Sequence, residues 1–284
     1  MVYAHLLNTQ GSAYYELNKL KLCREAHEAA IAIREQLLPE YDPEVAISFG
    51  NLGNVEAAEG NVDEALMWFE KAAKIREHAG DKAAIMLGLN YLQIGRAHFQ
   101  KGKEYYSVAY DFYQKAEGIF NKKYAQSRIY IADLHYAHGN LEFAQEDYSA
   151  AARSYELCRR HSMDVNPLHP LTSAACYKLA CAAFEQNHHK KALNLLNRAL
   201  EIADIRSNGR VDGTCARILW KRAEILLDEP FGGQREEADR LKTEVEIKHK
   251  EIAEKLGIDE RLDELDENED KEKYFDLLVP GYFR

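Results

Sequence analysis

The sequence contains little that would break a helix: only 6 of its 284 residues are proline and 16 are glycine. Both residues disfavour the interior of a helix, and alanine, leucine, glutamate and lysine are abundant, so the composition indicates a nearly all-helical chain. No apolar run approaches the roughly 18 residues that a membrane-spanning helix needs. The N-terminus also lacks the basic and then apolar layout of a secretory signal. We therefore expect no membrane partner.

Cysteine and positive charge are also scarce. Five cysteines, an odd number without a C-x-x-C pair, favour a reducing compartment, and we expect the cytoplasm, with the nucleus as the alternative. The net charge is −10, and nine acidic and three basic residues within 259–273 account for −6 of it. A nucleic-acid-binding stack needs a basic stripe, so no nucleic-acid partner is expected. The acidic stretch is most simply a solvated segment.

A sequence repeat dominates what is present. Four glycines mark successive copies at intervals of 42, 42 and 44 residues, namely Gly11, Gly53, Gly95 and Gly139. The thirteen residues that begin at Gly53 return, with substitutions, in the thirteen that begin at Gly139. A fixed period of this size indicates a stack of similar supersecondary units. Each unit contacts its neighbours, and together the units form an extended binding surface.

Each copy contains two apolar patterns of helical period. A small residue in the first helix is matched by a larger one in the second, as expected where two helices approach closely. Two later copies have alanine instead of glycine, and two residues are inserted between the helices of the third copy. Six pairs are predicted, marked by Gly11 and His27, Gly53 and Phe69, Gly95 and Tyr113, Gly139 and Tyr155, Ala180 and Leu196, and Ala223 and Ala238.

This small–large–small pattern resembles the tetratricopeptide repeat, a helix–turn–helix unit of about 34 residues. The 42-residue spacing and the Pro-acidic-x-Pro linker at residues 39–43 look more like the kinesin-light-chain subtype, and His169-Pro170 is a partial echo of that linker. The end of the chain, residues 278–284, is similar to the C-termini of many fungal repeat proteins. The resemblance implies an all-α, right-handed superhelical solenoid of about six antiparallel helix pairs over residues 2–250. Residues 251–284 would add a helix extension, an acidic segment and an apolar tail.

Candidate chemistry is weak. The sequence from His27 begins like the zinc-protease helix motif, but Ile31 replaces the second histidine that the metal requires. His135 and His138 lie one turn apart without a third ligand at suitable spacing. No cysteine has an evident base beside it, and the glycine-rich segment 231–234 lacks the lysine of a phosphate loop. We therefore expect neither an enzyme nor a bound cofactor or metal ion.

The resemblance places the first helix of each pair on the concave face. Amides repeated along such a groove suit an extended peptide, because each offers a donor and an acceptor. In the kinesin-light-chain family asparagines hold cargo peptides in this way, and Asn51 occupies a matching slot. The basic clamp of chaperone-binding members is broken here, since Asn8, Leu89 and Gln93 replace its cations. The predicted groove residues are Asn8, Ser12, Asn51, Asn54, Gln93, Arg96, Tyr136, Asn140, Lys178, Trp220 and Lys221.

Function is therefore expected to be that of a non-catalytic scaffold that binds a peptide or a partner helix. Two alternatives remain open from the sequence. The chain could be the C-terminal sensor domain of a nucleotide-binding signalling ATPase of the STAND type, since the first helix begins at once and a fragment is as plausible as a complete protein. It could also be a structural module for self-association. The apolar residues 274–283 are expected to fold back, either as a cap or as an internal groove ligand, because leaving them in water is costly.

Overall fold

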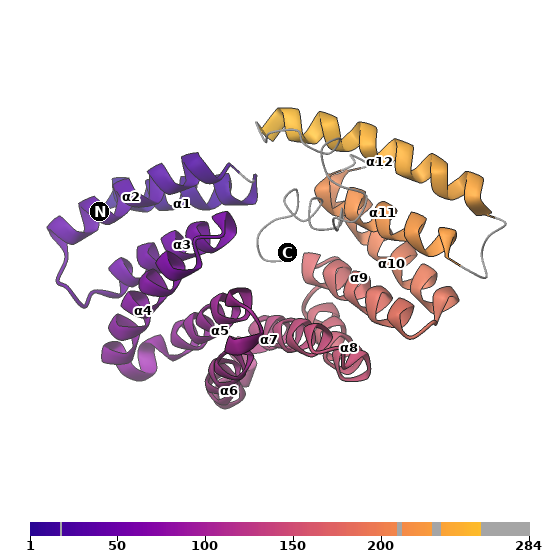
Figure 1. Ribbon diagram of the computed structural model, residues 1–284. Coiled ribbons are helices and arrows are strands. Elements are labelled where there is room, and N and C mark those ends of the chain that lie inside the picture. Colours follow the sequence, from indigo (N-terminus) through magenta and orange to yellow (C-terminus); the bar gives the residue numbers. More distant parts are fainter. Residues whose placement is uncertain (18, 209–211, 229–233, 257–284) are drawn as a thin grey trace. The chain divides into compact units, whose positions relative to one another are not determined.

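The computed structural model describes residues 1–17, 19–208, 212–228 and 234–256, and within these residues all regular structure is helical (Figure 1). The chain divides into two compact units, the first from Met1 to Leu141 and the second from Glu142 onward. The predicted all-α stack of helix pairs is confirmed. None of the described helices is both long enough and apolar enough to span a bilayer.

The first unit contains three antiparallel helix pairs, α1 with α2, α3 with α4 and α5 with α6, followed by most of α7. The residues inserted in the third pair form a short 3-10 helix, η2, and a second one, η1, joins α4 to α5. The bounds are α1 Val2–Glu16, α2 Leu20–Leu37, α3 Pro43–Glu59, α4 Val62–Ala79, η1 Gly80–Ala83, α5 Ala84–Lys101, η2 Lys103–Tyr105, α6 Tyr106–Lys122 and α7 Tyr124–Ala144.

The second unit contains α8 and two further pairs, α9 with α10 and α11 with α12. Its centre is α9, in which the residues from Leu171 to Ala183 are all buried except Lys178. Buried hydroxyls are paired in this unit, because Ser173 donates to the Ala199 carbonyl oxygen at 2.8 Å. The bounds are α8 Tyr148–Val165, α9 Pro170–Glu185, α10 His189–Ser207, α11 Gly213–Leu227 and α12 Arg235–Leu256.

The two linkers singled out in the sequence have the same local structure. At the start of α3 the Asp42 carboxylate accepts from the Glu44 backbone N–H at 2.9 Å, and Pro43 occupies the first turn. At the start of α9 the His169 Nδ1 accepts from the Leu171 backbone N–H at 3.1 Å, again followed by proline. A side-chain acceptor satisfies a free N–H of the first turn, and proline suits that turn because it has no N–H to lose.

The glycine period has a direct packing cause. A Cβ built on Gly53 would lie 2.5 Å from the Phe69 ring, and one built on Gly95 would lie 2.5 Å from the Tyr113 ring. The large side chain of the second helix therefore packs directly against the glycine backbone of the first. Alanine at the glycine position would fit only if the ring or the helix moved. The buried alanines on either side of Phe69, Ala65 and Ala72, are fully enclosed. The second and third pairs therefore share this contact between their two helices.

The segment expected to follow the stack lies almost wholly outside the described residues. Helix α12 is described to Leu256 and so runs past residue 250 without a break. The predicted division of the chain at residue 250 stays a prediction. The acidic stretch 259–273 and the apolar residues 274–283 are outside the described residues.

Candidate functional site

Polar side chains link the first helices of the first unit to one another. The Asn51 Nδ2 on α3 donates to the Asn8 Oδ1 on α1 at 2.9 Å. The Gln93 Nε2 on α5 donates to the Asn54 Oδ1 on α3 at 2.7 Å. We call these four side chains, with Arg96 of α5 and Asp133 of α7, the polar ladder, and the side of the unit formed by α1, α3, α5 and α7 the first-helix face.

The last rung of the ladder is an ion pair. Arg96 donates to both carboxylate oxygens of Asp133, at 2.6 and 3.1 Å, in the bidentate geometry that favours arginine over lysine. Their side chains are 24% and 20% exposed. Burial works against the charged guanidinium, but the charge and hydrogen bonds of Asp133 outweigh it and raise the pKa of Arg96. The pair is therefore a fixed, partly desolvated charge site.

Buried groups beneath the ladder hold its middle rung. Asn90, one turn before Gln93, donates to the Gln93 Oε1 at 3.3 Å and accepts from Arg76 of α4. Arg76 is 6% exposed and also donates to the Met86 carbonyl oxygen at 3.1 Å. Its described partners are neutral, and burial lowers its pKa to about 10. The buried guanidinium of Arg76 thus holds Asn90, which in turn orients the amide of Gln93.

The structure places most of the predicted groove residues of the first unit where a ligand could contact them. Asn8, Asn51, Asn54, Gln93 and Arg96 are half-buried and are brought together in the ladder. The exposed Ser12 hydroxyl donates to the carbonyl oxygen of residue 8 at 3.1 Å, one turn earlier in its own helix. Asn140 is half-buried near the end of the unit. Whether any of these residues binds a ligand stays a prediction.

Two of the predicted groove residues are buried, and whether they contribute to a groove stays a prediction. Tyr136 is fully buried, and its phenol lies close enough to Arg96 to influence the pKa of the guanidinium. A large ring beside an ion pair gains by leaving water, so it covers the pair. Trp220 is 4% exposed, its Nε1 donates to Glu224 at 3.1 Å, and the Lys242 ammonium of α12 lies 4.9 Å from its ring centroid.

The two predicted lysines lie in the second unit. Lys178 is the half-exposed residue of the otherwise buried stretch of α9. Lys221 is only 12% exposed in its side chain and pairs with the Glu224 carboxylate at 2.7 Å. The carboxylate of Glu224 therefore serves both Trp220 and Lys221, and no ladder comparable with that of the first unit joins α9 to α11 among the contacts described.

Two residues that contact the predicted groove residues, Asp133 and Asn90, were missed from the sequence. Each lies three residues before a predicted position, Tyr136 and Gln93 respectively, and so on the same face of its helix. That spacing was the signal that could have found them.

Residues considered for chemistry are used in packing. The His27 imidazole is 2% exposed, and a Cβ on Gly11 would lie 2.6 Å from it. His138 packs against the rings of Tyr110 and Tyr113. All five cysteines are buried as free thiols, and burial raises the pKa of Cys23 to about 12. Within the described residues no three His, Cys, Asp or Glu side chains gather as a metal site.

Comparison with known proteins supports the same architecture. The tetratricopeptide repeat family matches residues 2–78 and 130–204, more than half of the chain. The chain therefore belongs to the tetratricopeptide-repeat family. Proteins of this family are generally non-catalytic scaffolds for protein–protein interaction. No curated protein sequence matches the chain as a relative.

Solved structures share the fold at low identity. The apo form of RapI matches with a TM-score of 0.64 at 15% identity, covering 89% of this chain and 84% of that one. Cut9 in the APC/C hetero-tetramer Cut9–Hcn1 matches with a TM-score of 0.63 at 17% identity, covering 89% and 42%. BtubC (BKLC) from P. vanneervenii matches with a TM-score of 0.55 at 17% identity, covering 72% and 81%.

Proposed function

We propose that the first-helix face of the first unit binds an extended peptide segment of a partner protein through the polar ladder. The observation that carries the proposal is the row of half-buried amides on the first helices of three successive pairs. These amides are Asn8 on α1, Asn51 and Asn54 on α3, and Gln93 on α5. Amides fixed in one orientation suit the regularly spaced donors and acceptors of a peptide backbone.

The ladder leaves hydrogen-bonding capacity for a ligand. A primary amide has two donors and an oxygen with two lone pairs. The contact between Asn51 and Asn8 uses one donor of the first and one lone pair of the second. The amides are also held before a ligand arrives, which lowers the entropy lost on binding. The Arg96–Asp133 pair at the far end supplies one charge of each sign to a polar side chain of the peptide.

The subtype and the setting of the chain belong to the same proposal. The linker at residues 39–43, with Asp42 as the cap and Pro43 in the first turn, supports a kinesin-light-chain-like array. Burial of all five cysteines as free thiols supports a reducing compartment such as the cytoplasm. Cut9 was solved in assembly with Hcn1, so one protein of this fold does hold a protein partner.

A pull-down with a double variant tests the proposal. The Asn51→Ala/Asn54→Ala protein and the wild type are incubated with cell extract, and retained proteins are identified by mass spectrometry. Glu25→Ala, an exposed change on α2, is the matched control. We expect at least one protein to be retained by the wild type and the control but lost from the double variant. Equal retention by all three proteins, with all three folded by circular dichroism, would contradict the proposal.

A further inference from the structure

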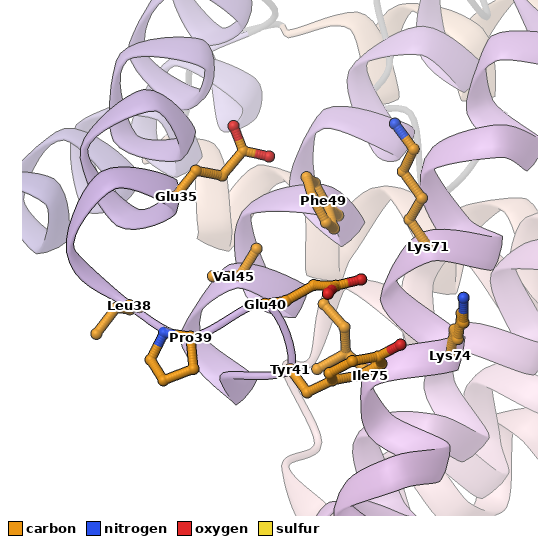
Figure 2. A pocket seen from close by; sticks show the side chains of 10 residues that line it. All are labelled: Glu35, Leu38, Pro39, Glu40, Tyr41, Val45, Phe49, Lys71, Lys74 and Ile75. Carbon is orange, nitrogen blue, oxygen red and sulfur yellow. The ribbon is translucent and has the colours of Figure 1, made fainter.

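A second candidate site lies on the other side of α3. A pocket of about 510 Å³ is formed by the end of α2, the linker at residues 39–42, α3 and α4 (Figure 2). This volume lies within the range of small-ligand and side-chain pockets. Its apolar part comes from Leu38, Pro39, Tyr41, Val45, Phe49 and Ile75. Val45 and Phe49 are on α3 but away from the ladder residues of that helix, so the two sites are separate.

The walls of the pocket carry opposite charges. The acids are Glu35 of α2 and Glu40 of the linker, and the bases are Lys71 and Lys74 of α4 (Figure 2). Phe49 lies between Glu35 and Lys71. Lys71 is engaged over the rings of Trp68 and Phe49, at 4.2 and 5.7 Å from their centroids. Lys74 and Glu35 are exposed, and neither has a hydrogen-bond or ion-pair partner among the described residues.

The next helix pair contains the same arrangement. Lys115 lies over Tyr91 and Phe112, at 5.7 and 4.4 Å from their centroids, just as Lys71 lies over Phe49 and Trp68. Tyr91 follows Phe49 by 42 residues, which is the repeat period. The two places are therefore equivalent positions in successive repeats, and a direct comparison between them is justified.

The equivalent of Glu35 is satisfied in the next pair. The sequence Ile-Arg-Glu near the end of α2, residues 33–35, recurs 42 residues later at residues 75–77 of α4. Here the Tyr91 hydroxyl donates to the Glu77 Oε1 at 2.8 Å. Phe49 has no hydroxyl, so Glu35 lacks the donor that its counterpart has. The position that matches Lys74, 44 residues on, is Gly118, so this lysine, unlike Lys71, has no counterpart in the next repeat.

From this comparison we propose that the pocket receives a tyrosine side chain of a partner protein, with a carboxylate of the same segment beside it. The ring packs on Phe49, Ile75 and Pro39, and its hydroxyl donates to Glu35 as Tyr91 donates to Glu77. A neutral donor suits the pocket because its two acids, Glu35 and Glu40, are already balanced by two lysines, Lys71 and Lys74. The neighbouring carboxylate of the segment pairs with Lys74.

The test uses methyl NMR of the full chain with the side chains of Val45 and Ile75 as reporters. The probe is acetyl-Tyr-Asp-amide, and the comparison probes are acetyl-Phe-Asp-amide and acetyl-Tyr-Asn-amide. We expect saturable shifts with the first probe at millimolar concentration. Loss of the hydroxyl should weaken binding by about threefold to tenfold, the effect of one hydrogen bond.

Variants of the pocket distinguish specific binding at this site from non-specific binding of the probes. Phe49→Tyr supplies the hydroxyl found in the next repeat, so it should satisfy Glu35 internally and abolish the preference for tyrosine over phenylalanine. Lys74→Ala should abolish the preference for aspartate over asparagine. The Asn51→Ala/Asn54→Ala protein should bind the probe as the wild type does, which keeps this result independent of the first-helix face. No saturable shift, equal affinity for the three probes, or unchanged preferences in both pocket variants would overturn the proposal.

Discussion

The imidazole of His27 occupies the space above Gly11 that Phe69 occupies above Gly53, and a Cβ on Gly11 would lie 2.6 Å from the ring. His27 is thus a titratable group in a position that other repeats fill with a hydrocarbon or phenol ring. Its Nδ1 has no hydrogen-bond partner in the part of the chain that the structure describes. Burial first, and the Arg34 charge second, lower the pKa of His27 from 6.5 to about 4.

Replacing His27 with phenylalanine should remove part of the acid sensitivity of the first unit. Between about pH 6.5 and 4 the unfolded chain binds a proton at this position and the folded chain does not, so stability falls as the pH falls through that window. The wild type should lose about 1–2 kcal/mol from this group on going from neutral pH to about pH 5. Chemical denaturation at both pH values measures it. The same pH dependence in His27→Phe and wild type would contradict the assignment.

Replacement of glycine by alanine should have opposite effects on stability at a glycine packed between helices and at an unpacked one. Gly53→Ala places a methyl group 2.5 Å from the Phe69 ring, and we expect a loss of about 1–3 kcal/mol in unfolding free energy. Gly118 in α6 has nothing within 4 Å of its Cβ position, so Gly118→Ala should stabilise by about 0.5–1 kcal/mol through helix propensity alone. Thermal denaturation of the two variants gives the comparison. A similar effect of both changes would mean that Phe69 moves aside at little cost.

The last rung of the polar ladder should show measurable coupling. In a double-mutant cycle with Arg96→Ala and Asp133→Ala we expect a coupling free energy of about 1–2 kcal/mol, because the pair is bidentate and only partly solvated. The control pair is Lys123 and Asp81, whose Nζ and carboxylate oxygen are 2.8 Å apart but whose acid is 82% exposed. Its coupling should stay below about 0.5 kcal/mol. Equal couplings would show that the ladder does not join α5 to α7 energetically.

The Tyr91 hydroxyl should make a modest contribution to the packing between α4 and α5. Removing it in Tyr91→Phe leaves Glu77 without this donor, and because Glu77 is exposed we expect a loss of only about 0.5–1 kcal/mol. The phenol should also titrate late, since burial and then the Glu77 carboxylate raise the pKa of Tyr91 to about 12. Ultraviolet difference titration of wild type against Tyr91→Phe reports that value directly. An ordinary tyrosine pKa near 10 would show that the contact with Glu77 is not maintained in solution.

The sequence was sufficient for the order of helices and for the contact inside each pair. Glycine opposite a ring at fixed spacing has one packing explanation, and the structure confirms it at Gly53 and Gly95. The inserted residues of the third pair also appear where expected, as η2.

The faces of single side chains were less predictable. The repeat register predicted Tyr136 and Trp220 as groove residues, and the structure buries both rings, which the register alone did not indicate. The sequence analysis also missed Asp133, although it lies three residues before the predicted Tyr136 and so on the same face of its helix. The ligand proposed for the pocket beside Phe49 was inferred from the hydroxyl that Phe49 lacks and Tyr91 has. The role of that hydroxyl is visible only in the contact between Tyr91 and Glu77 in the neighbouring repeat.

The buried arginines beneath the array bear on how such a chain could change in length. Arg34 donates to Ser48 at the first junction, and Arg76 donates to Asn90 at the second, with 42 residues between the two donors and between the two acceptors. Excising residues 43–84 would therefore bring Asn90 to the sequence distance from Arg34 that Ser48 now has. These two junctions use an equivalent buried arginine and acceptor, so deletion of this one repeat would leave an arginine and an acceptor in matching positions at the new junction.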